Sequence, residues 1–248
     1  MSKLSIKIKK LFRLYSRVER IGMYSQEQMA YQQLQRLSFN HAFLPVTVMS
    51  MSFTATLHIL NEIVINEKKS IIEFGSGIST VYIAKLLKEL DCNCNFYSVD
   101  TSKEWIDKMK QILEKESLLD KVIFIEAGIK DIPNSLRYKD QTKWYDIDLI
   151  NKGLKNAPDF DLVIVDGPNG WTCPYARNSA IPFLKGRTTD SVTIFLDDTK
   201  RPSEKEILIN WKSMLNMDVE NYSRYSIMYK PGMFTAEPFF YGSQPLYF

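Results

Sequence analysis

The stretch SIIEFGSGIST, residues 70–80, decides the fold. Its apolar residues at 71, 72 and 74 predict the end of a buried strand, in which Glu73 is out of place. Gly75 and Gly77 remove side chains where the chain must turn, so a ligand can approach the backbone closely. A helical pattern with small hydroxyl residues follows from position 79. The stretch therefore predicts a strand, a ligand-binding turn and a helix N-terminus.

The same alternation of strand and helix continues toward the C-terminus. Strands are predicted over 71–74, 96–99, 122–125, 162–165 and 192–196, with a late strand over 225–229. Helices are predicted over 52–65 and 79–90, from a capping box at Thr101 and Glu104, within 173–184, and after a second capping box at Ser203 and Glu206. This rhythm indicates a parallel sheet covered on both faces. We expect a doubly wound, mostly parallel α/β sheet.

Residues 1–50 predict a helical extension ahead of the main domain at 51–248. Lysines and arginines interleave with apolar residues over 3–20, which breaks any signal-peptide core. Such a basic amphipathic helix could lie on an anionic membrane. The alternative is a solvated helix that packs on its own domain, or on a sister subunit of a homo-oligomer. No apolar run is long enough to span a bilayer.

The composition is that of an ordinary globular chain of 248 residues, with 45% hydrophobic and 25% charged residues. This length suits one α/β domain with an extension. The net charge of +3 is too small to indicate a nucleic-acid partner. Cys92, Cys94 and Cys173 are interpreted as ordinary thiols in a reducing compartment. We therefore expect a cytoplasmic protein.

The pattern Glu73-x-Gly75-x-Gly77 after the first strand resembles the first motif of the class I S-adenosylmethionine-dependent methyltransferases, which have a Rossmann-like fold. In that family the acid lies near the amino-acid part of the cofactor, and the glycines line its cradle. Asp100 ends the second strand, where the family uses an acid to accept hydrogen bonds from both ribose hydroxyls. The stretch FDLVIVDGP, residues 160–168, matches the family's fourth strand. The resemblance implies S-adenosylmethionine as cofactor and these cofactor-binding residues: Glu73, Gly75, Ser76, Gly77, Ser79, Thr80, Asp100, Thr101, Glu126, Ala127, Asp166 and Gly167.

Other classes of protein stay open. Ile78 stands where many family members have a third glycine. A nicotinamide dinucleotide site would need a glycine in place of Thr80, and its pattern has no acid equivalent to Glu73. An NAD-dependent oxidoreductase is therefore disfavoured. The other alternative is a non-catalytic S-adenosylmethionine-binding module that acts in a complex.

Carboxylates gather at the ends of the predicted fourth and fifth strands. Asp166 follows one strand and Asp197 and Asp198 follow the other, so three like charges would crowd one spot if these strands are neighbours. The pattern is similar to that of the catechol-type and caffeoyl-CoA-type O-methyltransferases, in which such residues hold a divalent metal. Oxygen ligands suit Mg²⁺, Mn²⁺ or Ca²⁺, and a metal-bound acceptor hydroxyl would lose its proton readily. The alternative needs no metal, because Asp166 or Asp198 could act as the general base.

Three side chains near the predicted mouth could contact the acceptor. Trp171 and Arg177 follow the fourth strand, and Lys200 follows the acidic pair. Core packing is the alternative for Trp171. The stretch VDGP with a following Arg, and DDTKRP after the fifth strand, are similar to a bacterial group associated with sugar or polysaccharide modification. The resemblance therefore implies transfer of a methyl group from S-adenosylmethionine to an oxygen of a small-molecule, sugar or polysaccharide acceptor.

Overall fold

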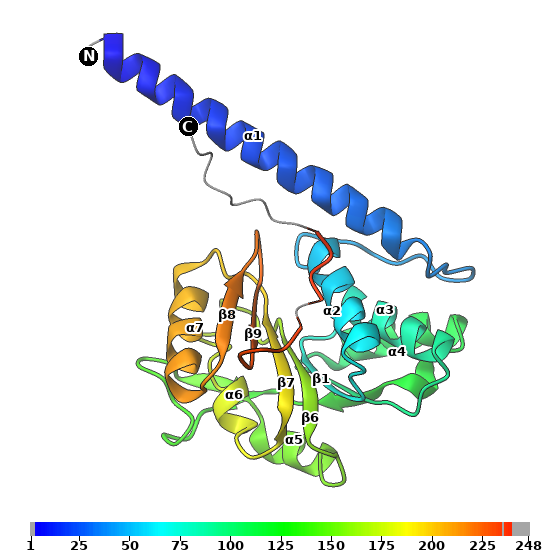
Figure 1. Cartoon of the computed structure of the whole chain (residues 1–248). Coiled ribbons are helices and arrows are strands. Elements are labelled where there is room, and N and C mark those ends of the chain that lie inside the picture. The colour runs from blue at the N-terminus through cyan, green and yellow to red at the C-terminus, as the bar shows by residue number, and fades with distance from the viewer. Residues whose placement is uncertain (1–2, 235, 240–248) are drawn as a thin grey trace.

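The computed structural model describes residues 3–234 and 236–239, with side chains from residue 13 onward. Its centre is a seven-stranded sheet (Figure 1). The strands are β1 (Ser70–Phe74), β2 (Asn95–Asp100), β3 (Ile123–Glu126), β6 (Phe160–Val165), β7 (Thr188–Leu196), β8 (Asp218–Asn221) and β9 (Ser226–Tyr229). They lie in the order β3-β2-β1-β6-β7-β9-β8. The first five of these are parallel, and β9 runs antiparallel to both of its neighbours.

Helices cover both faces of this sheet. They are α1 (Lys3–Leu34), α2 (Phe53–Ile65), α3 (Ile78–Glu89), α4 (Lys103–Lys115), α5 (Ile147–Gly153), α6 (Ala180–Phe183) and α7 (Pro202–Met214), with a 3-10 turn η1 (Leu119–Lys121). Residues of α2, α3 and α4 pack on one face together with Ile71, whereas residues of α5, α6 and α7 pack on the other together with Ile72. Because helices cover both faces, every residue of β1 is buried, including Glu73.

The predicted doubly wound sheet is confirmed. The predicted helix within 173–184 is wrong for most of its length, since only α6 forms there. The N-cap of α4 is Ser102 rather than Thr101, and α7 begins at Pro202, so Ser203 does not cap it. Proline suits the first helical position because its missing N–H would have no partner there. The hairpin of β4 (Ile129–Asp131) and β5 (Lys143–Tyr145), together with α5 and β8, was not predicted.

The order of the strands creates a crevice. From β1 the chain crosses to β2 on one side, and it later returns to β6 on the other side of β1. At such a reversal the connections that leave the two strands diverge, and ligands bind at the carboxyl ends of the strands there.

The two halves of α1 differ in their contacts. In the C-terminal half Ala30 and Leu34 are buried, and the Glu27 carboxylate accepts hydrogen bonds from the N–H groups of Phe53 (2.9 Å) and Thr54 (3.3 Å) at the start of α2. A carboxylate is favoured at a helix N-terminus by the helix dipole. The N-terminal half projects beyond the domain (Figure 1).

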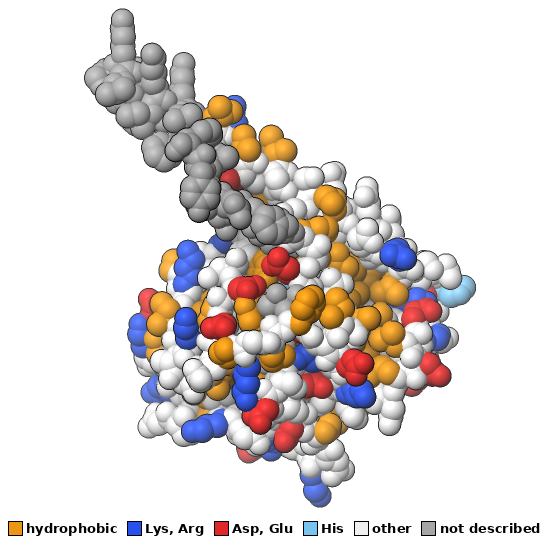
Figure 2. Space-filling model, in the orientation of Figure 1, with side chains coloured by type: hydrophobic (Ala, Val, Ile, Leu, Met, Phe, Trp, Pro, Cys, Tyr) orange, Lys and Arg blue, Asp and Glu red, His pale blue; other side chains and the backbone are white. Residues whose placement is uncertain are grey.

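The surface of the domain shows no large region of one charge on the visible face. Figure 2 shows acidic and basic side chains interspersed there, with apolar side chains between them. Among the described residues, no helix is both long and apolar enough to cross a membrane.

Candidate active site

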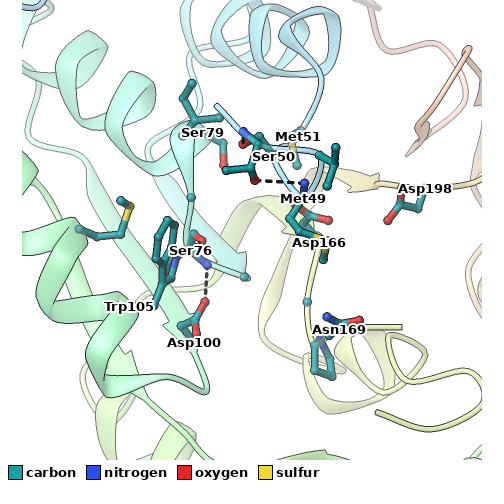
Figure 3. Close-up of a pocket in the computed structure, with 18 of the residues that line it drawn as sticks. Met49, Ser50, Met51, Ser76, Ser79, Asp100, Trp105, Asp166, Asn169 and Asp198 are labelled. Atoms are coloured by element: carbon teal, nitrogen blue, oxygen red, sulfur yellow. Dashed lines mark hydrogen bonds between the residues drawn. The ribbon is translucent and has the colours of Figure 1, made fainter. Parts of the chain in front are cut away.

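A cavity of about 390 Å³ lies at the carboxyl edge of the sheet, where β1 and β6 diverge. The turn after β1, the end of β2 and the loop after β6 line it, and residues 44–51 of the α1–α2 connection close one side. Figure 3 shows Ser76, Asp100 and Trp105 at one end, with Asp166 and Asp198 toward the other. We call these the β2 end and the β7 end.

The two glycines of the turn after β1 are required for different reasons. Gly75 has a φ of +99°, and a Cβ there would lie 2.9 Å from the backbone nitrogen of Gly167, so this glycine lets β1 and β6 close on each other. A Cβ on Gly77 would meet nothing within 4 Å. Gly77 lines the cavity, so its missing side chain leaves room for a ligand rather than for protein.

Asp100 is held so that both carboxylate oxygens keep free acceptor capacity. One oxygen accepts the N–H of Ser76 at 3.0 Å and the other that of Ser102 at 2.9 Å. A carboxylate oxygen has two lone pairs, so each can take one more hydrogen bond from the cavity. Burial raises the pKa of Asp100, and the backbone N–H groups oppose this. The arrangement fits a ligand with two neighbouring hydroxyls.

Glu73 lies beneath the cavity rather than in it. Its side chain is fully buried and accepts hydrogen bonds from the hydroxyls of Ser79 (2.5 Å), Thr80 (2.5 Å) and Ser98 (2.8 Å). Burial raises its pKa to about 7, against the opposing effect of these hydroxyls. The Ser98 hydroxyl also pairs with the Ser76 hydroxyl at 2.9 Å. A chain of hydrogen bonds through these two serines therefore links Glu73 to the cavity.

At the β7 end three carboxylates meet, as the sequence predicts. Ligand atoms of Asp166, Asp197 and Asp198 lie within 4.8 Å of one another. The guanidinium of Arg177, only 3% exposed, donates to Asp166 at 3.0 Å, to Asp198 at 3.1 Å and to the backbone oxygen of Asp197 at 2.9 Å. Burial, together with Asp197, raises the pKa of Asp166 well above its usual range, although Arg177 acts in the opposite direction.

Two further arginines complete this cluster. Arg201 pairs with Asp198 at 2.9 Å, and Arg224 pairs with Asp197 at 3.3 Å and with Asp198 at 3.4 Å. Three carboxylates are thus matched by three guanidinium groups. We call these six residues the acid–arginine cluster.

The acid–arginine cluster offers a set of oxygen ligands to a divalent metal, but Arg177 competes for two of its three carboxylates. The donor atoms are all oxygens, which would suit Mg²⁺. However, one nitrogen of Arg177 bonds to both Asp166 and Asp198, so a metal bridging these carboxylates would have to displace it. The cation required among the carboxylates is supplied by the chain itself.

The remaining predicted residues fall into two groups. Ser79, Thr101 and Gly167 line the cavity. Thr80 and Ala127 are buried outside the cavity lining, and Glu126 is exposed. Of the predicted acceptor residues, Trp171 is 83% exposed and Lys200 lies against Met23, both outside the lining, whereas Arg177 is bound within the acid–arginine cluster.

Some lining residues were not predicted. Trp105 donates its indole N–H to the backbone oxygen of Ser76 at 2.8 Å and presents its ring to the β2 end. Tyr145 is buried at the end of β5, and its hydroxyl occupies the space where a Cβ on Gly167 would lie. A signal for Trp105 was its place five residues after Asp100. No comparable signal existed for Tyr145, because β5 itself was missed.

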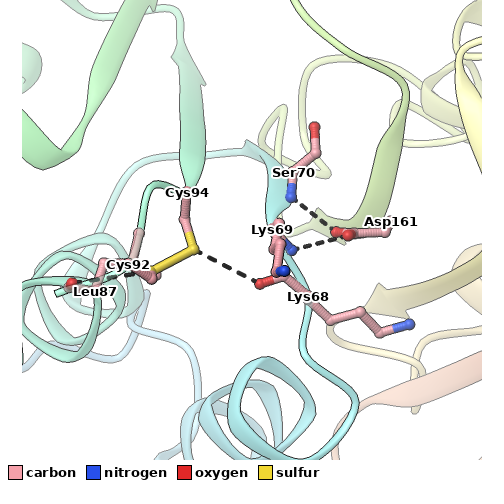
Figure 4. Close-up of a disulfide and its surroundings, with 7 residues drawn as sticks. All are labelled: Lys68, Lys69, Ser70, Leu87, Cys92, Cys94 and Asp161. Atoms are coloured by element: carbon pink, nitrogen blue, oxygen red, sulfur yellow. Dashed lines mark hydrogen bonds between the residues drawn. A yellow bond between two sulfur atoms is a disulfide. The ribbon is translucent and has the colours of Figure 1, made fainter. Parts of the chain in front are cut away.

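The cysteine prediction was wrong for two of the three residues. Cys92 and Cys94 form a disulfide after α3, with their Cα atoms 5.5 Å apart (Figure 4). Cys173 is free. The turn between α3 and β2 brings the two thiols into the range that a disulfide spans. Neither residue lines the cavity.

Comparison with known proteins relates this fold to methyltransferases. No protein-family model matches the sequence, and no curated protein matches it. The structure is similar to the O-methyltransferase from Bacillus cereus in complex with SAH (TM-score 0.53, 14% identity, 83% of this chain and 91% of that chain). It is also similar to the O-methyltransferase TomG from Streptomyces achromogenes, involved in tomaymycin synthesis and in complex with SAM (0.52, 12%, 84% and 90%). A third similar structure is precorrin-6y C5,15-methyltransferase from Geobacter metallireducens GS-15 (0.51, 13%, 76% and 95%). The resemblance to class I methyltransferases is thereby confirmed at the level of the fold.

Proposed function

We propose that this chain is an S-adenosylmethionine-dependent methyltransferase that acts on an oxygen of a small-molecule, sugar or polysaccharide acceptor. The observation that carries the proposal is one cavity with two different ends. At the β2 end, Asp100 offers two acceptor sites beside the open backbone of Gly77. At the β7 end, Asp166 faces the same cavity.

The β2 end would hold the cofactor, whose sulfonium supplies an activated methyl group. Asp100 would accept hydrogen bonds from the two ribose hydroxyls, and Trp105 would offer a flat apolar wall to the adenine. When Glu73 is ionised, its carboxylate can only accept hydrogen bonds. The Ser98 hydroxyl therefore donates its hydrogen to Glu73 and accepts a hydrogen bond from the Ser76 hydroxyl. The Ser76 hydroxyl is then left with lone pairs only, which suit a cationic group of the cofactor.

The β7 end would bind the acceptor and take its proton. Asp198 is engaged by three arginines, whereas a single ion pair engages Asp166 through one carboxylate oxygen. We therefore assign Asp166 as the general base and Asp198 to the positioning of the arginines. Arg201 and Arg224 line the cavity and are partly exposed, so they could contact an anionic or polyhydroxyl acceptor.

Calorimetry and product assays test this proposal. We expect binding of S-adenosylmethionine and S-adenosylhomocysteine, no binding of NAD, and formation of S-adenosylhomocysteine with a suitable acceptor. Binding of NAD alone would contradict the proposal and support the oxidoreductase alternative. Cofactor binding without turnover against broad acceptor pools would support the non-catalytic binding module.

The proton-transfer scheme has its own test. We expect Asp166→Asn to abolish turnover while sparing cofactor affinity, and treatment with EDTA to leave the activity of the wild type unchanged. Activity that disappears with EDTA and returns with Mg²⁺ would restore the metal-based alternative, with Asp166, Asp197 and Asp198 as ligands.

We also propose that the protein is cytoplasmic. Rapid trapping of thiols in intact cells tests this placement. Although the structure pairs Cys92 with Cys94, a cytoplasmic location requires that both are captured as free thiols in the cell, and a persistent disulfide would contradict it.

A further inference from the structure

Residues 14–21 of α1 carry an apolar stripe that faces solvent. Leu14, Val18 and Ile21 follow one another at helical spacing and are 58%, 59% and 67% exposed. Tyr15 lies beside them and is 61% exposed. An apolar surface that is continuous rather than scattered indicates an interaction site.

This stripe is not an extension of the face that packs on the domain. At about 100° per residue, Val18 lies roughly 120° around the helix from the buried Ala30. The domain-facing line continues backward from Ala30 through Met23 to Ser16, which is polar and exposed. The apolar stripe therefore has a separate role from anchoring α1, and the part of the helix that carries it projects from the domain (Figure 1).

The charge of the chain is concentrated in the same segment. Residues 1–20 contain seven lysines and arginines and one acid, a net charge of +6. The whole chain has a net charge of +3, so the remaining residues carry −3. Arg13, Arg17 and Arg20 are exposed and lie roughly 100–160° around the helix from Val18. Within residues 13–21, whose side chains the structure describes, the helix thus has an apolar side and a cationic side.

We propose that α1 docks on an anionic lipid bilayer through residues 13–21. The apolar stripe would enter the boundary between headgroups and acyl chains, and the arginines would contact lipid phosphates. A second copy is a poorer partner, because pairing two such helices would bring together two segments of charge +6 with one acid each. Nucleic acid would match the charge but would leave the apolar stripe in water.

Vesicle flotation of the full chain tests the proposal. We expect binding to phosphatidylcholine vesicles that contain about a quarter phosphatidylglycerol, and at least about tenfold weaker binding to pure phosphatidylcholine. Arg17→Gln should weaken binding about fivefold, and Ile21→Glu at least about tenfold. The matched control is Ile209→Glu on α7, which alters a side chain of similar exposure, 69%, and should bind as the wild type does.

Unfolding curves that coincide for the Ile21→Glu and Ile209→Glu variants would show that both fold. Failure of the wild type to bind anionic vesicles would overturn the proposal. So would equal binding by the two variants. Light scattering that reveals a wild-type dimer, dissociated by Ile21→Glu, would assign the stripe to a second copy instead.

Discussion

The two ends of the cavity are built by different means. At the β2 end, Asp100 and Glu73 are held by backbone N–H groups and hydroxyls, and in the described contacts no arginine or lysine touches either carboxylate. At the β7 end, each carboxylate is paired with arginine. The first end therefore has acceptor capacity left for a ligand, whereas at the second each carboxylate has an arginine within ion-pair distance.

This difference separates binding from chemistry. Neutral donors hold Asp100 in place without neutralising its charge, so its carboxylate can bind the hydroxyl groups of a ligand. Guanidinium groups hold together the acids that follow β6 and β7, which would otherwise repel one another. Changes to Asp100 and Gly77, which face the ligand space, should therefore act mainly on cofactor affinity, and changes at the β7 end mainly on stability and turnover.

The largest effect is expected from Arg177→Met. This change leaves Asp166 and Asp198 without the cation that bridges them, and removing one partner of a buried ion pair costs about 3–5 kcal/mol. Urea unfolding measures the loss. The control Arg137→Met alters an exposed arginine and should change the free energy of unfolding by no more than about 0.5 kcal/mol.

A metal titration sharpens this prediction. Mg²⁺ should raise the melting temperature of the Arg177→Met variant, whose vacated space is surrounded by carboxylates, and should leave that of the wild type unchanged. If the variant were as stable as the wild type without added ions, Arg177 would not be the counter-ion of the acid–arginine cluster.

The next effect concerns the pH dependence of Glu73. Its pKa is about 7 in the folded chain against 4.5 ordinarily, so the folded state binds the proton more tightly. The free energy of unfolding should therefore fall by about 3 kcal/mol as the pH rises from about 4.5 to about 7. Glu73→Gln should remove this fall.

Comparing the Glu73→Gln variant with the wild type separates the contribution of Glu73 to the pH dependence from that of other groups. His58 is also buried, with its pKa lowered to about 3, so its own contribution to stability rises as the pH rises from about 3 to 6.5. That contribution is present in both proteins and cancels in the difference. The exposed Glu114→Gln is the control and should follow the wild type; a Glu73→Gln variant that also follows it would contradict the assigned pKa.

Asp100→Ala should lower the affinity for S-adenosylmethionine about 100-fold, because hydrogen bonds to a charged group contribute about 1.5–3 kcal/mol each. Asp100→Asn keeps one acceptor oxygen and should fall between the alanine variant and the wild type. Calorimetry measures all three. Asp107→Ala, on the exposed side of α4, is the control. Unchanged affinity in Asp100→Ala would remove this residue from the cofactor site.

The sequence was more informative for the β2 end than for the β7 end. Gly75, Gly77 and Asp100 belong to consecutive strand–turn units, so local pattern places them together. The proximity of Asp166 and Asp198 could also be predicted, because they follow two strands that were expected to be neighbours. The position of Arg177 among them did not, because no local pattern relates it to residues on two strands and the segment around it is not the predicted helix.

Glu73 shows a different limit of the sequence. The motif indicated that an acid belongs at this position, but whether it faces the ligand depends on its surroundings. Three hydroxyls, from α3 and β2, enclose it and separate it from the cavity. Burial of this kind follows from packing between elements, which the one-dimensional pattern does not encode.

The smallest effect distinguishes the two glycines of the β1 turn. Gly75→Ala should lower the free energy of unfolding by about 1–3 kcal/mol, because its φ is positive and its Cβ would press on the Gly167 backbone. Gly77→Ala should leave stability within about 0.5 kcal/mol, since its φ of −171° is extended and its Cβ meets only open space. Because that space belongs to the cavity, the same change should lower cofactor affinity about tenfold, or about 1.4 kcal/mol. An affinity loss without a stability loss at Gly77 is what a ligand cradle requires, and the reverse pattern would make the turn purely structural.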